Sequence, residues 1–362
     1  MLDRLPVELV QHIVRLTLPS PSHATYRERQ DRLLVLCRTS RALRTVGQTV
    51  LFEVVELASR EQFSSFLEAV KANELSERVR SVQLYEDPYG RNMFQLAAGD
   101  YASLVRRCPR LAELRIAHSR VDLAELQEAT YLQRLIISRG TAYVSRPFVL
   151  PQVEELSLLG IGNLEDFLPT HSFPSLSAFH IEMADFGEFK PEQLLSLLPH
   201  LDAFSIDFRD VLCSATGPAR TLASSPRVLF DLTPHSIEGL LEDFEAVLAA
   251  ARALRLKAGA AALSNYADLT PALNCLVANL ARLTGLQHLV LPTECLWCKG
   301  WNVDYHRALA DLRAACQARG IDVVFEPQGD FEYDSLVSPE FWRRCKALKA
   351  KEEDETKGKE QQ

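Results

Sequence analysis

The chain has no apolar run long enough to cross a membrane, since its most apolar late stretch, 247–251, ends at Arg252. Its beginning carries no apolar signal-peptide region, and no Asn-x-Ser/Thr glycosylation acceptor occurs. The eight cysteines follow no framework spacing, which in a chain of 362 residues indicates reduced thiols. We therefore expect a protein of the cytoplasm or the nucleus, without membrane contact.

An excess of positive charge is also absent. Lys and Arg number 40 against 48 Asp and Glu, a formal net charge of −8, which argues against nucleic-acid binding. Apolar residues make up 47% of the chain, enough for a sizeable core. The length leaves room for one small and one larger unit, or for a single elongated one.

The familiar catalytic motifs are missing. There is no Gly-rich phosphate loop, no His-Glu-x-x-His and no Gly-x-Ser-x-Gly elbow, so we expect neither an enzyme nor a cofactor. Cys295 and Cys298 have a spacing that can hold one edge of a zinc ion, with His288 and His306 nearby and Cys316 further on. The usual second close pair is absent, so free thiols at the end of a repeat are the favoured interpretation and no metal is expected.

The first fifty or so residues predict three short helices. Pro6 suits the first turn of a helix, because its missing N–H would be unpaired there anyway. Apolar residues follow it at helical spacing, on a face wider than one stripe: Leu5, Leu9, Val10, Ile13, Val14 and Leu16. A second apolar run covers 33–37, and Thr39 or Ser40 can cap a third helix. A helix that is apolar over so much of its circumference must be covered on two sides.

These residues resemble an F-box, particularly the fungal kind. The resemblance rests on Leu5-Pro6-x-Glu8-Leu9-x-x-x-Ile13, on Leu36-Cys37-Arg38-Thr39-Ser40-Arg41-Ala42-Leu43 and on Val50-Leu51-Phe52. It implies docking to the Skp-type adaptor of a cullin–RING ubiquitin ligase. The adaptor-binding residues would be Leu5, Pro6, Glu8, Leu9, Ile13, Leu36, Cys37, Leu43 and Leu51. The alternative is an ordinary helical cap on a larger domain.

From residue 79 onward the chain repeats itself, with large apolar residues at the first, fourth and sixth positions of each unit. The clearest copies are Leu111/Leu114/Ile116, Leu132/Leu135/Ile137, Val153/Leu156/Leu158, Leu176/Phe179/Ile181, Leu201/Phe204/Ile206 and Leu286/Leu289/Leu291. Weaker copies lie at Ala251/Leu254/Leu256 and around Phe230/Leu232, and 323–325 ends the series. Proline often precedes the first position by two residues, which ends a helix and starts an extended strand.

This pattern resembles the leucine-rich repeats found behind F-boxes. It implies an α/β fold, in which a short helical F-box is followed by a solenoid of parallel strands and return helices. We predict an F-box-like domain at 1–57, a leucine-rich-repeat-like solenoid at 58–345 and a charged disordered tail at 346–362. The stretch 210–227, rich in Ser, Gly, Pro and Ala, is expected to loop out of the solenoid.

Alternation along each repeat strand defines a second face. Because the first, fourth and sixth positions point inward, the third, fifth and seventh should face an open concave surface. Its centre is acidic and its flanks are basic, so it could hold a basic segment of a partner. The candidate substrate-binding residues are Arg115, Arg134, Glu155, His180, Glu182, Asp207, Arg255 and His288.

The sequence thus favours a substrate receptor of a Skp–cullin–F-box ubiquitin ligase, which binds the adaptor with its F-box and a protein substrate with its repeats. A scaffold that assembles proteins without a role in degradation is the alternative. The identity of the substrate does not follow from the sequence.

Overall fold

The computed structural model divides the chain into two compact units, Met1–Leu176 and Ser177–Gln362, here called the N-terminal and the C-terminal unit. The helical start and the first repeats therefore share one unit, and the division falls inside the segment predicted as one solenoid. The residues described are 6–19, 26–72, 75–84, 96–117, 119–138, 141–160, 172–182, 195–207, 217–233, 245–257, 269–293, 303–326 and 337–360.

The N-terminal unit begins with three helices, α1 (Val7–Thr17), α2 (Tyr26–Thr39) and α3 (Arg41–Leu51). The predicted cap of the third helix is confirmed, because the Ser40 side chain accepts a hydrogen bond from the Leu43 N–H at 3.1 Å. Pro6 stands immediately before α1 as its N-cap residue. Helix α3 continues to Leu51, and the first strand, β1 (Val54–Leu57), starts shortly after it.

Parallel strands then alternate with helices or turns. The remaining elements of this unit are α4 (Arg60–Ala72), η2 (Leu75–Glu77), β2 (Ser81–Leu84), α5 (Asp100–Arg107), β3 (Glu113–Ala117), β4 (Arg120–Asp122), η3 (Leu123–Leu126), β5 (Arg134–Ser138), β6 (Thr141–Tyr143) and β7 (Glu155–Leu159). Strands β1, β2, β3, β5 and β7 pair in that order, all in parallel. The short strands β4 and β6 pair with each other in a second, two-stranded sheet.

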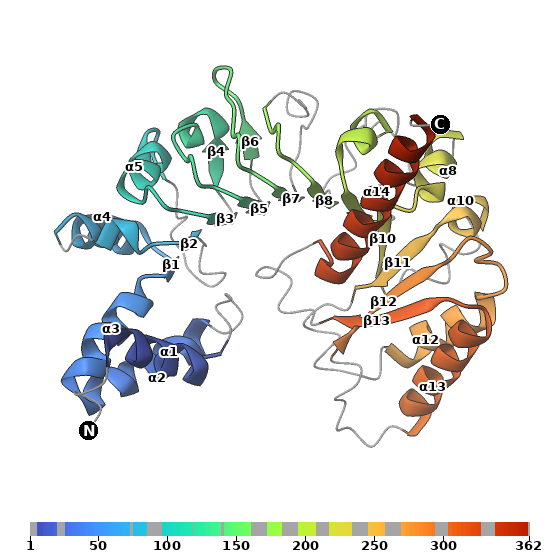
Figure 1. Ribbon diagram of the computed structural model, residues 1–362, viewed down its shortest axis with the longest axis horizontal. Coiled ribbons are helices and arrows are strands. Elements are labelled where there is room, and N and C mark those ends of the chain that lie inside the picture. The colour runs from blue at the N-terminus through green and yellow to red at the C-terminus, as the bar shows by residue number, and fades with distance from the viewer. Residues whose placement is uncertain are drawn as a thin grey trace. The chain divides into compact units, whose positions relative to one another are not determined.

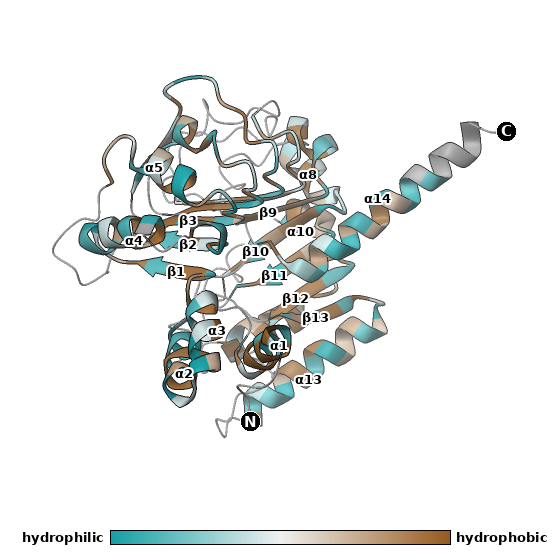
Figure 2. Ribbon diagram, turned by 60° about the vertical axis from the view of Figure 1, so that its left-hand side comes forward, coloured by the Kyte–Doolittle hydropathy of each residue, from teal (hydrophilic) through white to brown (hydrophobic). Residues whose placement is uncertain are grey.

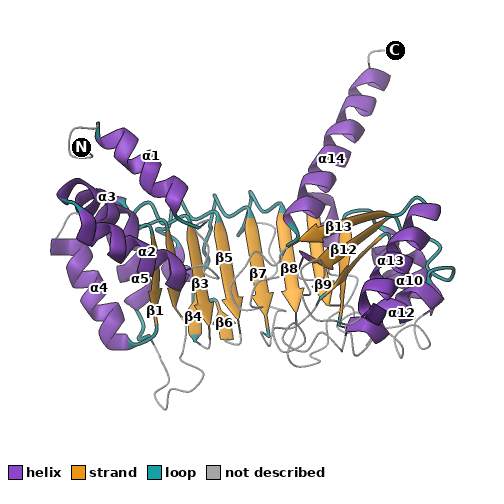
Figure 3. Ribbon diagram, turned by 90° about the horizontal axis from the view of Figure 1, so that it is seen from below, coloured by secondary structure: helices purple, strands orange, loops and turns teal. Residues whose placement is uncertain are grey.

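The C-terminal unit repeats the arrangement. Its elements are β8 (Ala178–Glu182), η4 (Leu198–His200), β9 (Ala203–Asp207), α8 (Gly217–Ser224), β10 (Val228–Leu232), α10 (Glu245–Ala250), β11 (Ala253–Leu256), α12 (Leu269–Asn279), β12 (His288–Pro292), α13 (Val303–Ala318), β13 (Asp322–Glu326) and α14 (Pro339–Glu360). Strands β8 to β13 pair in chain order and in parallel. In Figure 1, α10, α12 and α13 lie on one side of these strands and α14 on the other. Figure 3 shows neighbouring arrows pointing the same way.

The register confirms the apolar repeat. In the N-terminal unit one column of paired residues runs through Val55, Val82, Leu114, Leu135 and Leu156. In the C-terminal unit another runs through Ile181, Ile206, Phe230, Leu254, Leu289 and Val323, so that the sixth positions of the first two copies join the fourth positions of later ones. All are buried except Val323, which is half-buried on the last strand. Strand, return segment and parallel strand therefore recur as predicted, with both weaker copies forming strands.

Two predicted irregular segments are helical where the structure describes them. The stretch expected to loop out contains α8, because Ala219, Leu222 and Ala223 form an apolar stripe that is buried. The tail expected to be disordered continues α14 as far as Glu360. Both predictions were wrong. Burial of that stripe outweighs the composition around α8, whereas the described side chains from 346 on are exposed or half-buried, and the helix there continues from the buried turns before it.

A close approach of backbones fixes the turn before β12. The Gly285 N–H donates to the Ala249 carbonyl at 2.8 Å, and a Cβ at this position would lie 2.8 Å from that oxygen and 2.9 Å from the Ala250 oxygen. We expect Gly285→Ala to lower the free energy of unfolding by about 1–3 kcal/mol, since backbone atoms must shift. Urea unfolding measures it. Gly217→Ala is the matched control, because no atom lies within 4 Å of its added Cβ, and an equal loss in both variants would contradict the argument.

Candidate interaction surfaces

Helix α1 divides its apolar residues between two faces. Val10 and Val14 are buried against the other two helices, whereas Leu9 and Leu16 are 51% and 72% exposed and Ile13 is 39% exposed. Residues 9, 13 and 16 follow each other at spacings of four and three, so they form one stripe along the helix. Figure 2 shows the hydrophobic colour on α1.

Exposed apolar side chains gather in this region. Of the nine large apolar side chains exposed in the described part of the chain, six belong to α1 and α2: Val7, Leu9, Ile13, Leu16, Leu34 and Val35. Single exposed apolar residues are normal on any surface, but a contiguous set marks a site of interaction. We call Leu9, Ile13 and Leu16 the α1 stripe.

Other predicted adaptor-binding residues serve the core of the three helices. This core comprises Val10, Val14, Leu18, Leu33, Leu43, Val46 and Val50, with Leu36 and Leu51 packed against it in part. Leu43 is only 5% exposed, so its assignment to the adaptor surface is corrected to a supporting role. Leu36 and Leu51 are half-buried and are likewise committed in part to holding α1 in place.

The remaining predicted adaptor residues fall into three groups. Pro6 and Glu8 are exposed beside the α1 stripe, as a docking surface requires. Cys37 is half-buried and faces α3, since a Cβ added to Gly47 would lie 2.6 Å from its sulfur. Leu5 lies outside the described residues. The described adaptor-binding candidates before and on α1 therefore lie together on the surface. Those of α2 and α3 are buried or half-buried instead.

Ion pairs tie α1 and α2 to the segment before β1. The Arg15 guanidinium donates to Glu53 at 2.8 Å, and Arg29 lies 3.6 Å from the same carboxylate. Arg29 is 4% exposed, and burial lowers its pKa more than Glu53 raises it. The Arg29 guanidinium also donates to the Pro19 carbonyl at 3.0 Å. These contacts fix the direction in which the α1 stripe is presented.

The concave face of the N-terminal unit carries a row of ion pairs. Arg134 donates to Glu155 at 2.6 Å and to Glu113 at 3.2 Å, and Arg115 donates to Glu113 at 2.5 Å. Burial acts against the charge on Arg134, but the two carboxylates together raise its pKa. Glu155 is 1% exposed and Arg115 is 5% exposed. These residues are on the predicted face, yet they are paired with each other and mostly buried.

A second polar group occupies the concave face of the C-terminal unit, across four neighbouring strands. We call His180, Glu182, Ser205, Asp231, Arg255 and Lys257 the polar cluster. Arg255 makes two hydrogen bonds of 2.7 Å to the Asp231 carboxylate and lies 3.3 Å from the Ser205 hydroxyl. Lys257 pairs with Glu182 and lies 3.8 Å from Asp231. Asp231 is fully buried and is the hydrogen-bonded carboxylate of Arg255, while Glu182 also compensates the charge of Lys257.

His180 is the least satisfied member of the polar cluster. It is fully buried, both ring nitrogens lack a hydrogen-bond partner, and its Nδ1 lies 3.9 Å from Asp231. Burial holds the pKa of His180 well below its usual value, and the positive charges of Lys257 and Arg255 lower it further. The imidazole is therefore neutral at physiological pH.

Helix α14 covers the concave face of the C-terminal unit. Val337, Phe341 and Cys345 are fully buried, and Trp342 packs beside them. They rest on a row of small and apolar side chains, Ala178, Ala203, Leu229, Ala253 and Val290, here called the apolar row. The Phe341 ring also lies 5.9 Å from the His288 ring, centroid to centroid. Alternation along the strands places the apolar row and the polar cluster on the same face.

The predicted open substrate surface is therefore corrected. Among its candidates, Asp207, Arg255 and His288 are 2%, 6% and 1% exposed, while Arg134 and Glu182 are half-buried. Acidic residues expected to attract a basic partner are already paired within the chain, as Glu155 is with Arg134 and Glu182 with Lys257. Alternation identified the face correctly, but it carries no information about what covers that face.

Two further predictions concern metals and membranes. Cys295 and Cys298 lie outside the described residues, so the expectation of free thiols without zinc there stays a prediction. In the part of the chain that the structure describes, no group of three or more His, Cys, Asp or Glu side chains could hold a metal ion. None of the helices described there is both long and apolar enough to span a bilayer.

Comparison with known proteins adds little. No protein-family model matches the chain, and no curated protein matches it. Among solved structures, the crystal structure of a TLR13–ssRNA13 complex is similar at 13% identity and a TM-score of 0.33. The match covers 59% of this chain and 32% of TLR13, so the chain spans about a third of that protein. A similarity at this level carries no argument about function.

Sequence reasoning missed one element that shapes the N-terminal unit. The β4–β6 sheet is too short for its pattern to stand out, and polar contacts hold it in place. Arg120 lies over the Tyr143 ring at 4.5 Å, and Asp122 caps η3 while accepting hydrogen bonds from Ser145. A three-residue strand offers no countable alternation, so no signal in the sequence would have identified it.

Proposed function

We propose that this protein is the substrate-recognition subunit of a Skp–cullin–F-box ubiquitin ligase. The α1 stripe binds the Skp-type adaptor, which links the chain to a cullin scaffold. The repeats, proposed to be a divergent leucine-rich-repeat solenoid, bind a protein substrate. The chain performs no bond chemistry itself. It holds a target lysine near the ubiquitin thioester of the ligase and so raises the effective concentration of the reacting groups.

One observation carries this proposal. The residues that resemble an F-box at Leu9 and Ile13 are apolar and exposed on the free chain, while their neighbours Val10 and Val14 build the core. An apolar stripe supported by its own small core is what docking to a partner requires, and an ordinary cap would bury it. The fold of the repeats agrees with a solenoid, since parallel strands pair in chain order and the strand of each repeat pairs with those of the neighbouring repeats.

The proposal predicts loss of adaptor binding when the α1 stripe becomes charged. We expect the full chain to form a stoichiometric complex with a Skp-type adaptor, and Leu9→Glu/Ile13→Glu to weaken it about 100- to 1,000-fold. Each anchoring side chain at the centre of an interface is worth about 2 kcal/mol or more. Isothermal titration with purified adaptor measures the affinity, and circular dichroism checks that both chains are folded.

Val303→Glu is the matched control. Val303 is 67% exposed on α13 in the C-terminal unit. The substitution therefore introduces a charge at an equally accessible apolar position and leaves α1 unchanged. Adaptor binding should be unchanged in this variant. If the wild-type chain stays alone in the presence of the adaptor, or if both variants lose binding equally, the receptor proposal is rejected and the three helices are a cap.

A further inference from the structure

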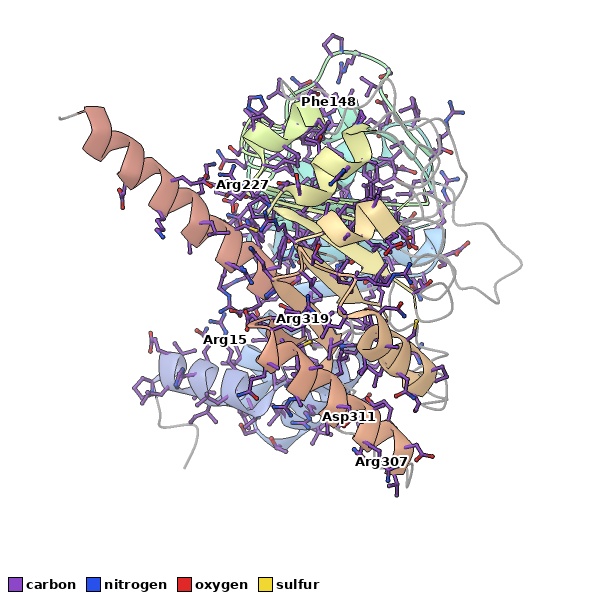
Figure 4. All side chains as sticks on the ribbon, turned by 90° about the vertical axis from the view of Figure 1, so that its right-hand side faces the viewer. Arg15, Phe148, Arg227, Arg307, Asp311 and Arg319 are labelled. Carbon is purple, nitrogen blue, oxygen red and sulfur yellow. The ribbon has the colours of Figure 1, made fainter. Side chains whose placement is uncertain are left out.

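Helix α14 occupies the face on which a substrate was expected. At its start the Glu340 N–H donates to Glu326 at 2.8 Å, and Arg344 lies 3.6 Å from Asp322. Within the described part of the helix, Phe341 and Cys345 are its buried side chains, and Val337 precedes it at the same spacing of four residues. Beyond Cys345, two ion pairs continue the contact: Lys349 donates to Asp202 at 2.8 Å, and Glu352 pairs with Arg227. Figure 4 shows Arg227 beside α14.

The fit of α14 is incomplete. The Trp342 indole nitrogen and the Nε2 atom of His288 are buried and have no hydrogen-bond partner. A buried polar atom without a partner costs free energy, so a helix that satisfied His288 Nε2 and buried no unpaired indole nitrogen of its own would bind this face more tightly than α14 does. The other side of α14 is charged and exposed, with Arg343 at 72% exposure, and adds nothing to the contact. The face therefore accepts a helix, and α14 leaves one of the buried polar atoms of that face unpaired.

We propose that the apolar row, with Asp202 and Arg227, is the docking site for an amphipathic helix of a partner protein, and that α14 is its intramolecular competitor. The partner helix would carry large apolar residues at positions i, i+4 and i+8, a basic residue at i+12 and an acidic residue at i+15. This is the spacing of Val337, Phe341, Cys345, Lys349 and Glu352. The inference rests on the proposed function only in naming this partner as the substrate.

Competition makes the site measurable with a peptide. The probe is a fluorescein-labelled peptide of residues 337–354, titrated into the full chain and followed by fluorescence anisotropy. A tethered helix competes at an effective concentration on the order of millimolar, so the wild-type chain should bind the probe weakly. The chain variant Phe341→Ala weakens its own α14 and should bind the probe at least tenfold more tightly. Lys349→Ala, which removes only the ion pair, should act in the same direction and is the alternative if Phe341→Ala does not fold.

Two controls distinguish binding at the docking site from a general loss of stability of the C-terminal unit. Arg343→Ala changes the exposed side of α14 and should bind the probe as weakly as the wild-type chain. Asp202→Lys should prefer a probe carrying Lys349→Asp over the natural probe by at least tenfold, since the ion pair is reversed. Equal binding of both probes would show that Asp202 does not recognise the helix and would overturn the proposal.

The thiol of Cys345 reports whether α14 has left its site. Burial raises the pKa of Cys345 to about 12, and its sulfur lies 3.8 Å from the Pro226 carbonyl, so alkylation should be slow while the helix is docked. A saturating probe whose own Cys345 is replaced by alanine should accelerate alkylation of the chain's Cys345 at least tenfold, as read site by site with mass spectrometry. Unchanged alkylation together with equal probe binding by wild type and Phe341→Ala would make α14 a permanent part of the unit.

Two further outcomes are distinguished. A mass that rises with concentration to that of a dimer in light scattering would make the occupant a second copy of the chain, and would overturn the partner proposal. Adaptor binding is tested independently, because Leu9→Glu/Ile13→Glu should leave probe binding unchanged and Phe341→Ala should leave adaptor binding unchanged. Failure of either proposal therefore leaves the other standing.

Discussion

Replacing Asp231 by alanine should lower the free energy of unfolding by about 3–5 kcal/mol. The Asp231 carboxylate is fully buried and accepts two hydrogen bonds of 2.7 Å from Arg255, with Lys257 3.8 Å away. Its removal leaves the Arg255 guanidinium, only 7% exposed, without the carboxylate to which it is hydrogen-bonded, and Glu182 and Glu326 act on it through charge alone. Urea unfolding followed by circular dichroism measures the loss.

A double variant separates the value of the ion pair from the cost of breaking it. Asp231→Leu/Arg255→Met removes both charges, and we expect it to recover most of the stability lost in Asp231→Ala, since apolar residues of similar volume can replace a buried pair. Asp322→Ala is the matched control: its carboxylate is 61% exposed and should contribute about 1 kcal/mol or less. If Asp231→Ala unfolds like Asp322→Ala, the polar cluster is not the confined network that its contacts indicate.

The repeat could be predicted from sequence because its signal is local. Each strand carries its apolar residues at the same three positions, so the pairing of Leu114 with Leu135, and of Leu135 with Leu156, follows from aligning the copies. The Ser40 cap could be predicted for the same reason, since it depends on neighbours three residues away. Local periodicity therefore fixed the strands and the concave face without any information on tertiary contacts.

The cover on the concave face could not be predicted in this way. Lys349 meets Asp202 and Glu352 meets Arg227 across 147 and 125 residues of sequence. Residues 346–362 contain few large apolar side chains, so composition predicted disorder, whereas contacts distant in sequence accompany a helix there. Alternation could assign His180 and Asp207 to one side of the strands, but their burial depends on segments that no pattern connects to them.

The polar cluster should make stability depend on pH. His180 is neutral in the folded chain because its pKa is held well below the usual value, while in the unfolded chain it titrates near about 6.5. The unfolded state therefore binds more protons below that pH, and the stability that depends on neutral His180 is fully present above about pH 6.5 and falls as the pH is lowered. Below about pH 6.5 we expect the contribution of this residue to fall by at most about 1.4 kcal/mol per pH unit.

Substitution of His180 by leucine tests this sign. Both ring nitrogens are buried without partners, so at neutral pH His180→Leu should be as stable as the wild-type chain or more so. Below pH 6.5 the urea midpoint of His180→Leu should fall less steeply than that of the wild-type chain. Both chains retain Asp231, Lys257 and Arg255, so the comparison isolates the contribution of His180. His200→Leu, which removes an exposed imidazole, should keep the wild-type dependence. Parallel curves for wild type and His180→Leu would mean that the buried imidazole accepts a proton without cost, which a site flanked by two cations does not allow.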